Sequence, residues 1–296
     1  MKKEDVIIRD EIKSVINKID NFAIDNFALR FRFPEITESE KKGERKIKIE
    51  IINDIDKVGK SIFTSQKSII SDINERRKKS ILTLEKFGYK VIEFTAKPCW
   101  RMVVGLGGTH PQETSMILHH VYGFPYIPGS SIKGVTRSMF ILDWFEKVKK
   151  ALVSENIDLS KFVAGLENYN PKSAKNQLPE YYDRELVDLY SNIFGTQEYQ
   201  GKVIFFDAFP VGEINLVLDI INPHYPDYYS GNKPPADYQN PNPIKFLTVA
   251  NTNFLFVLAG ENEKIVIEAE RYLKQALQAI GIGAKTSLGY GLFEIL

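Results

Sequence analysis

The sequence predicts an α+β fold, and three observations lead to this class. Apolar residues recur at helical spacing over residues 131–152 and again over 265–280. Short runs rich in β-branched and aromatic residues, such as 201–209 and 254–258, have the composition of buried strands. After Gly88 these elements follow one another as strand, helix, strands, helix and strand. We therefore expect helices and strands to be mixed within one domain.

Residues 1–88 precede this domain and differ from it in composition. They are rich in Ile, Lys, Asp and Glu, and Pro34 is their only proline. Apolar residues recur at helical spacing from Ile12 to Ile19 and from Ile47 to Val58, and more loosely from Ile62 to Leu84. We therefore expect a helical N-terminal region that is packed on the core and broken before Pro34.

The first half of the domain holds two predicted strand segments and a helix. Residues 89–94 have the composition of a strand, and residues 100–104 that of its continuation or partner. The predicted helix over 131–152 comes next. A polar insertion over about 154–192 follows, and we expect it to be helical in part.

The second half is predicted to hold several strands and a helix. A strand over 201–209 precedes one over 214–221, and two more, 246–250 and 254–258, surround a turn. A second insertion over about 222–243 contains six of the chain's 14 prolines, which predicts an irregular loop. The second predicted helix and a final strand complete the chain.

This order of elements is βαββαβ, the ferredoxin-like or RRM-like arrangement. Residues 89–296 are thus predicted to form one ferredoxin-like domain with the two insertions. In such an arrangement two helices cover one face of an open sheet. The other face is then expected to be free for a ligand.

Charge patterning limits how the chain could bind a polyanion. Lys and Arg total 39 and Asp and Glu total 38, which gives a net charge of +1. A positive field over the whole molecule is therefore excluded, and phosphates must be held by local clusters. Two basic clusters, Lys41 to Lys48 and Arg76 to Lys79, are interpreted as solvated helix faces rather than as RNA contacts.

Composition excludes further classes of protein. Cys99 is the only cysteine, so one chain can form neither a disulfide framework nor a cysteine-based zinc site. We expect no metal and no cofactor. No apolar run approaches the roughly 20 residues that span a bilayer. The charged N-terminus lacks the apolar core of a signal peptide, so we expect a cytoplasmic protein without membrane contact.

A glycine-rich loop between the last helix and the last strand is the first candidate site. Its members are Gly281, Gly283, Lys285, Gly289 and Gly291. Glycines permit positive φ and close backbone approach, so phosphates could take backbone N–H groups and the Lys285 ammonium. A Walker A loop is excluded, because it needs Gly-Lys directly before Ser or Thr and a helix after it. The alternative is a tight turn between helix and strand.

The segment IPGSSIKGVTR, residues 127–137, is the second candidate. Its start combines helix N-terminal N–H groups, two hydroxyls and two cations, a combination that suits phosphate. The groups come from Gly129, Ser130, Ser131, Lys133 and Arg137. We expect the two cations on the side of the helix opposite its apolar stripe, which consists of Ile132, Val135, Met139 and Leu142. The alternative is an N-cap followed by solvated cations.

Histidines offer the only recognisable acid–base chemistry. His110 and His120 flank the loop that precedes the second candidate site and could serve a ribonuclease, although core or surface histidines are more common. No pair of catalytic groups has a recognisable spacing. Asp207 is interpreted as a hydrogen-bonded turn residue rather than a metal ligand.

Several segments together resemble a known family. IPGSSIKGVTR, GKVIFFDAFP and the terminal GIGAKTSLGYG resemble the RAMP superfamily of CRISPR-associated RNA-binding proteins, over about residues 88–296. LYSNIFGT and the loop beginning NPHYPDYYSG are similar to the sixth subunit of type III-B Cmr effector complexes. The resemblance implies a ferredoxin-like RAMP core. It assigns RNA contact to Gly129, Ser130, Ser131, Lys133, Gly134, Arg137, Gly281, Gly283, Gly289 and Gly291, and Lys285 is added on chemical grounds.

The resemblance also implies a function. It implies a non-catalytic subunit that caps the Cmr filament near the crRNA 3′ region in antiviral RNA silencing. Its expected partners are crRNA, other Cmr subunits and, as a further candidate, target RNA. The alternative that stays open is a metal-independent CRISPR RNA endoribonuclease on the same fold that uses a histidine.

Overall fold

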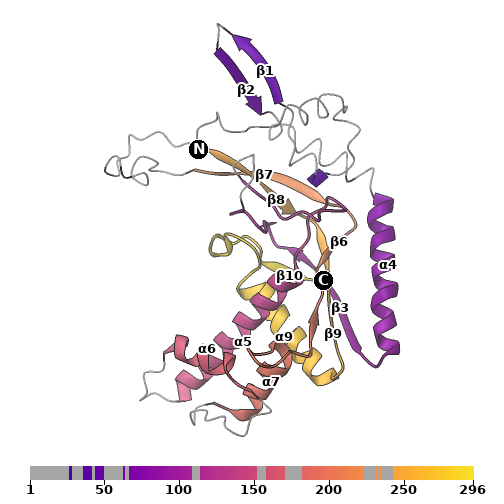
Figure 1. Cartoon of the computed structure of the whole chain (residues 1–296), viewed down its shortest axis with the longest axis vertical. Coiled ribbons are helices and arrows are strands. Elements are labelled where there is room, and N and C mark those ends of the chain that lie inside the picture. Colours follow the sequence, from indigo (N-terminus) through magenta and orange to yellow (C-terminus); the bar gives the residue numbers. More distant parts are fainter. Residues whose placement is uncertain are drawn as a thin grey trace.

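The protein, described here from a computed structural model, has a mixed α/β architecture with antiparallel sheets (Figure 1). The structure describes residues 27–28, 36–41, 44–49, 63, 67–108, 114–151, 158–170, 182–222, 231, 234 and 243–296. Its strands are β1 (Ile36–Lys41), β2 (Glu44–Ile49), β3 (Lys90–Pro98), β4 (Arg101–Met102), β5 (Ile204–Phe205), β6 (Phe209–Val211), β7 (Asn215–Ile221), β8 (Ile244–Ala250), β9 (Asn253–Gly260) and β10 (Phe293–Ile295). Its α-helices are α4 (Lys67–Lys86), α5 (Gly129–Ala151), α6 (Leu159–Glu167), α7 (Arg184–Phe194) and α9 (Glu263–Ala279).

The largest sheet has the strand order β10-β3-β9-β5, and β6 also pairs with β9. All of these pairs are antiparallel. Phe94 of β3 lies opposite Phe256 of β9, and their rings stack with centroids 5.3 Å apart. The strands predicted over 89–94, over 254–258 and at the C-terminus are confirmed.

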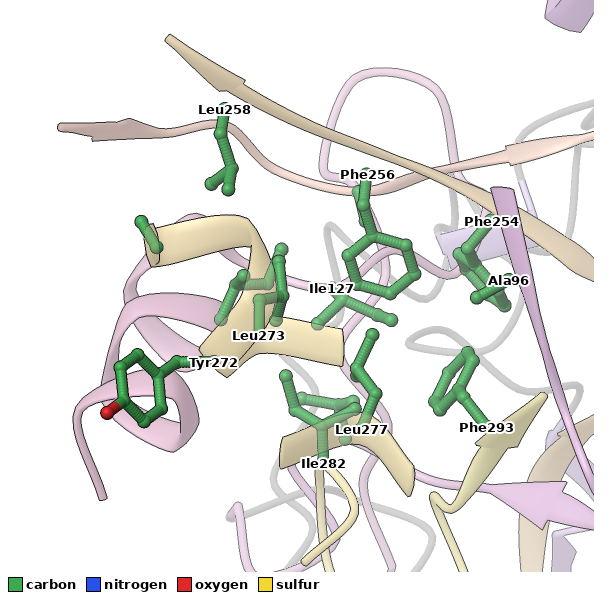
Figure 2. Packing of buried hydrophobic residues seen from close by; sticks show 14 of the residues in the cluster. Ala96, Ile127, Phe254, Phe256, Leu258, Tyr272, Leu273, Leu277, Ile282 and Phe293 are labelled. Carbon is green, nitrogen blue, oxygen red and sulfur yellow. The ribbon is translucent and has the colours of Figure 1, made fainter. Parts of the chain in front are cut away.

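Helices α5 and α9 cover one face of this sheet (Figure 1). Phe254, Phe256 and Leu258 alternate along β9, so their side chains share a face. Figure 2 shows Phe256 and Leu258 directed toward Leu277 and Leu273 of α9, while Phe254 lies above Phe293. The apolar period predicted over 265–280 is therefore confirmed, because α9 turns that face into the core.

Helix α4 lies on the opposite face (Figure 1). Lys78 of α4 pairs with Glu93 of β3 at 3.9 Å, whereas Lys274 of α9 lies over the ring of Phe94. Neighbouring strand residues point to opposite faces, so the two helices sandwich β3. The expectation that the second face is free is wrong where α4 covers β3 and β6, because this helix from the N-terminal third packs there.

A separate three-stranded sheet has the order β4-β8-β7. The predicted strands 246–250 and 254–258 thus belong to different sheets, since the chain passes from one sheet to the other at Asn251 and Thr252. Asn251 has φ of 48°, and Thr252 accepts a hydrogen bond from the N–H of Asn215. Arg101 pairs with Ala250, so the segment 100–104 joins this second sheet and does not pair with β3.

The N-terminal third contains a two-stranded sheet where a helix was predicted. β1 and β2 pair antiparallel, with Ile36 opposite Ile49 and Lys41 opposite Glu44. The prediction of a helix through Ile47 is wrong. Its physical reason is the alternation Lys46-Ile47-Lys48-Ile49, which has the period of a strand. Helix α4 confirms the helix predicted over the later part of this region.

Two further expectations change in the domain. The predicted strand 201–209 is divided into β5 and β6, which are both short and which both pair with β9. The buried stripe of α5 runs at intervals of four through Ile132, Thr136, Phe140, Trp144 and Val148, whereas Leu142 is exposed. The predicted stripe is therefore wrong at Leu142, while Ile132, Val135 and Met139 do pack in or against the core. Leu142 is left out because the helix turns its aromatic side toward α7 and α9.

The two insertions are described to different extents. α6 and α7 confirm partial helicity within 154–192. His110, most of 222–243, the predicted helix from Ile12 to Ile19 and the part of the next predicted helix beyond Ile49 lie outside the described residues. Among the helices that the structure describes, none is long and apolar enough to span a membrane.

Candidate nucleic-acid interface

The start of α5 is fixed by a carboxylate from the sheet. The backbone N–H of Gly129 donates a hydrogen bond of 2.7 Å to Oδ1 of Asp207. Asp207 lies between β5 and β6, which confirms its interpretation as a hydrogen-bonded turn residue. A carboxylate at this place satisfies a free helix N–H and complements the helix dipole. The N-terminus predicted to receive a phosphate thus already receives an anionic group of the protein.

Backbone packing explains why a glycine stands at position 129. A Cβ atom there would lie 2.2 Å from the carbonyl oxygen of Phe205. The chain just before Gly129 is joined to the segment between β5 and β6. Ile127 and Ala208 exchange two backbone hydrogen bonds there, of 3.0 and 2.8 Å. The motifs around 127–137 and 201–209 therefore meet in space, and their first shared role is to join α5 to the sheet.

The other residues of the first helical turns differ in exposure. Ser130 and Gly134 are exposed, while Ser131 and Lys133 are half-buried. Burial and, secondly, nearby Arg137 lower the pKa of Lys133. Lys133 makes no ion pair with any described residue. In the first turns of α5, Lys133 is therefore the residue whose positive charge is available to an anionic ligand.

Arg137 is already engaged within the protein. Its Nε donates to the hydroxyl of Tyr190 at 2.6 Å, and its Nη2 donates to the carboxylate of Glu167. Burial lowers the pKa of Arg137, and the bonds to Tyr190 and Glu167 more than compensate, so its pKa is raised. The alternative interpretation of Arg137 as a solvated cation is wrong, because Arg137 ties α5 to α6 and α7.

Helix α4 contributes a second internal cation near the start of α5. The Arg77 guanidinium donates to the backbone carbonyl of Asp207 and lies 4.3 Å from the centroid of the Phe209 ring. Burial lowers the pKa of Arg77 to about 10, an effect that Asp207 opposes. Its neighbours Arg76, Lys78 and Lys79 are exposed, so the prediction of a solvated helix face is wrong at Arg77 and is confirmed at the other three residues.

Protein backbone also accounts for three glycines of the terminal loop. A Cβ atom at Gly283 would lie 2.3 Å from the carbonyl oxygen of Val103, and one at Gly291 would lie 2.0 Å from that of Ile282. Gly281 has φ of 77°, and a Cβ atom there would meet Gly291 at 2.9 Å. The close approach that glycine permits is thus used here by the protein itself.

The part of the loop around Gly289 is more open. Gly289 has φ of 88° and nothing within 4 Å of a Cβ position, and Leu288 beside it is 65% exposed. Lys285 also has a positive φ, 63°. Its Nζ lies 5.3 Å from the centroid of the Phe246 ring and 6.0 Å from that of Tyr290. Lys285 makes no ion pair with any described residue.

An aromatic and charged cluster supports this loop, and sequence reasoning missed it. The hydroxyl of Tyr290 donates to Asp219 at 2.5 Å, and Arg101 Nη1 lies 2.6 Å from the same carboxylate. Burial and then this hydrogen bond raise the pKa of Tyr290 to about 12. Trp100 contacts the Tyr290 ring at 4.8 Å. The cluster draws on β4, β7 and the terminal loop, so no local sequence signal could reveal it.

The described histidines lie in a group of aromatic rings before α5. His119 stacks on His120 and Tyr122, with centroids 5.2 and 4.5 Å away. Its Nδ1 accepts from the N–H groups of Val121 and Tyr122, and burial and then His120 lower its pKa. His120 is exposed. Among the described residues, no three His, Cys, Asp or Glu side chains gather as a metal site would require.

Most of the chain matches the sequence model of a known protein family. The sequence model of the RAMP superfamily matches residues 100–294, which contain the start of α5, β5 to β9 and the terminal loop. This chain belongs to the RAMP superfamily. The resemblance seen in the sequence is thereby confirmed. In this RAMP protein, both candidate sites fall within the matched region.

Two curated relatives carry the same subunit name. The chain is 40% identical over 224 residues to the CRISPR system Cmr subunit Cmr6 of Pyrococcus furiosus, a match that covers 64% of each chain. It is 26% identical over 218 residues to the Cmr6 subunit of Saccharolobus solfataricus, which covers 72% of this chain and 60% of that protein. The RAMP chain thus spans about three fifths of the length of these relatives.

A solved structure shares the fold. A chain in the cryo-EM structure of the type III-B Cmr-beta complex bound to cognate target RNA matches 97% of this chain and 86% of its own length. The TM-score is 0.54 at 20% sequence identity, so this likeness shows the RAMP fold alone.

Proposed function

We propose that this chain is the Cmr6-type subunit of a type III-B CRISPR (Cmr) ribonucleoprotein complex. In this role it binds crRNA and neighbouring Cmr subunits, and target RNA is a further candidate ligand. It caps the filament near the crRNA 3′ region in antiviral RNA silencing. The observation that carries the proposal is the 40% identity to the P. furiosus subunit over 224 residues.

The strand order supports the finer assignment of a ferredoxin-like core. Counted along the chain, β3 comes first, β5 and β6 second, β9 third and β10 fourth, with α5 after the first strand and α9 after the third. The sheet order β10-β3-β9-β5 then corresponds to 4-1-3-2, with antiparallel neighbours throughout. We assign this core to residues 89–296, and α4 of the preceding region packs on it.

RNA contact is assigned to two segments. The first holds Gly129, Ser130, Ser131, Lys133, Gly134 and Arg137, and the second holds Gly281, Gly283, Lys285, Gly289 and Gly291. Lys133 and Lys285 are the strongest members, because each is a half-buried cation without an ion-pair partner among the described residues. An unpaired cation is stabilised by an anionic ligand such as a phosphate. Arg137 is a weaker candidate for direct contact, because its guanidinium already binds Tyr190 and Glu167.

Co-purification tests the proposed function. The tagged chain, isolated from its host, is expected to bring down crRNA and the other Cmr subunits, identified by RNA sequencing and mass spectrometry. A Lys133→Ala, Lys285→Ala double variant is the matched comparison, with reduced RNA recovery expected. Recovery of the chain without RNA and without Cmr proteins would contradict the proposal.

The absence of catalysis is tested separately. The purified chain is expected to leave repeat RNA and target RNA intact without added metal. His119 Nδ1 accepts two backbone N–H groups and is therefore occupied, which leaves exposed His120 as the described candidate for acid–base chemistry. Cleavage that His120→Ala or His110→Ala abolishes would instead establish the ribonuclease.

A further inference from the structure

Trp100 and Trp144 are the two tryptophans of the chain, and they have opposite environments. Trp144 is 2% exposed and packs in the core of the helical layer. Trp100 is 51% exposed, although it lies two residues beyond β3, one of the two inner strands of the main sheet. A large exposed indole contributes little to the stability of the core, so its presence here needs another explanation.

The exposed indole is held in a defined position. Its ring contacts Tyr290 at 4.8 Å with an interplanar angle of 53°, and the Arg101 guanidinium lies 5.2 Å from its centroid. Both neighbours are themselves fixed, because Tyr290 and Arg101 share the carboxylate of Asp219. Trp100 is therefore an oriented aromatic surface and not a freely rotating side chain.

The charge beside Trp100 favours an anionic ligand. Asp219 is neutralised by Arg101 at 2.6 Å. Lys285 Nζ lies 6.0 Å from the centroid of Tyr290, the same ring that Trp100 contacts, and Lys285 has no ion-pair partner among the described residues. The cluster thus retains one positive charge close to an exposed aromatic ring.

The backbone of Lys285 indicates that its side chain has a specific role. Within the described part of the chain, Asn251 and Lys285 are the two non-glycine residues with positive φ. Asn tolerates this conformation, whereas Lys does so at a cost that glycine avoids. The surrounding loop uses glycine at four such positions. A lysine that replaces the favoured residue indicates a requirement for the ammonium group.

We propose that Trp100 stacks on one base of single-stranded RNA while Lys285 binds a phosphate of the same strand. Aromatic platforms beside cations are the general means by which proteins hold single strands. The contact is tolerant of sequence, since every base offers a π face. This inference rests on the proposed RNA-binding function and adds to it a residue outside both motif segments.

Tryptophan fluorescence tests the contact directly. The full chain is titrated with a short oligouridine while anisotropy of the labelled RNA reports affinity. Stacking on Trp100 should quench its emission and protect it from acrylamide, with buried Trp144 as the constant background. Trp100→Ala should weaken affinity by about five- to 150-fold, the range measured for loss of one base–aromatic stack. Trp100→Phe should retain part of that affinity.

Two comparisons make the test specific. Phe87 is an aromatic residue that is 74% exposed at the end of α4, so Phe87→Ala should leave RNA affinity unchanged. Lys285→Gly removes the ammonium and also the unfavourable φ. We expect this variant to bind RNA more weakly, with a reduced salt dependence, while its unfolding midpoint is equal or higher.

The outcomes separate this inference from the proposed function. RNA binding with unchanged Trp100 emission, or equal affinities for Trp100→Ala and Phe87→Ala, overturns the stacking contact and leaves the RNA-binding function intact. If Trp100→Ala binds RNA normally but fails to enter the Cmr complex, Trp100 contacts protein and the inference is wrong. If the full chain and its assembled complex bind no RNA, both proposals fail.

Discussion

The carboxylate of Asp207 and the backbone N–H of Gly129 form a 2.7 Å hydrogen bond that joins the sheet to the first residue of α5. This bond connects two segments that are 78 residues apart in the chain. Arg77 of α4 also reaches Asp207, through the backbone carbonyl. Helices on opposite faces of the sheet therefore meet at a single residue between β5 and β6.

Gly129 and Gly134 should respond in opposite ways to the same substitution. Gly129→Ala places a Cβ atom 2.2 Å from the Phe205 carbonyl, which should lower the free energy of unfolding by roughly 1–3 kcal/mol or more. Gly134 is an exposed position inside α5 with open space around a Cβ atom. Gly134→Ala should raise the free energy of unfolding by up to about 1 kcal/mol. Urea denaturation of both variants measures these free energies of unfolding. Equal changes in the two variants would contradict the close packing of Gly129 against Phe205.

Arg137 and Lys133 should separate stability from RNA binding. Arg137→Ala leaves the buried hydroxyl of Tyr190 and the carboxylate of Glu167 without their cation, so the free energy of unfolding should fall by about 1–3 kcal/mol. Lys133→Ala breaks no ion pair with a described residue and should stay within about 0.5 kcal/mol of the parent protein. RNA affinity of the folded Lys133→Ala variant should nevertheless fall. A destabilised Lys133→Ala variant would show that this lysine is structural.

RNA binding should depend on salt in proportion to the number of phosphates held. The net charge of +1 provides no general field, so the affinity must come from a few local contacts. The slope of log affinity against log salt is about −0.7 for each phosphate neutralised on a single strand. Anisotropy titrations over a range of salt concentrations measure it. An affinity that does not change with salt would argue against phosphate contacts.

Tyr290 should give the protein a measurable alkaline dependence of stability. Burial and the bond to Asp219 raise its pKa from 10.0 to about 12, so the folded protein holds this proton more tightly than the unfolded chain does. Its contribution to the free energy of unfolding is fully present below about pH 10 and is lost as the pH rises through 12.

Tyr290→Phe removes this contribution. We expect the variant to be less stable at neutral pH by about 1.5–3 kcal/mol, and to lose less stability than the parent protein between pH 10 and 12. Tyr122→Phe, which changes an exposed tyrosine, is the control. Parallel pH profiles for the parent protein and the Tyr290→Phe variant would exclude this role.

Local patterns predicted the elements of the fold better than their pairing. The helix α9 was predictable because its apolar residues keep one period along a single face. The N-terminal hairpin was missed because Ile47 and Ile51 fit a helix while Ile47 and Ile49 fit a strand. The division of β8 and β9 between two sheets depends on Asn251 and on partners distant in the chain, which no local pattern encodes.

The candidate sites show the same division between local and distant information. The glycines at 283 and 291 correctly predicted close backbone approach, but a missing Cβ does not reveal which group comes near. In this protein the neighbours are Val103 and Ile282. The partners of Arg137 lie 30 and 53 residues away, so its internal ion pair could not be predicted from helix spacing.

The anchoring of the terminal loop lowers the conformational entropy that the protein loses when a ligand binds there. Ala284 donates to the Val103 carbonyl at 2.8 Å, Gly291 donates to that of Arg101 at 2.7 Å, and Ile282 donates to that of Gly291 at 2.8 Å. The loop is therefore preorganised before it meets a ligand. A bound strand loses its own conformational freedom but does not have to order this part of the protein. These three amides should exchange slowly with solvent deuterium in the free protein, and ligand binding should add little to their protection.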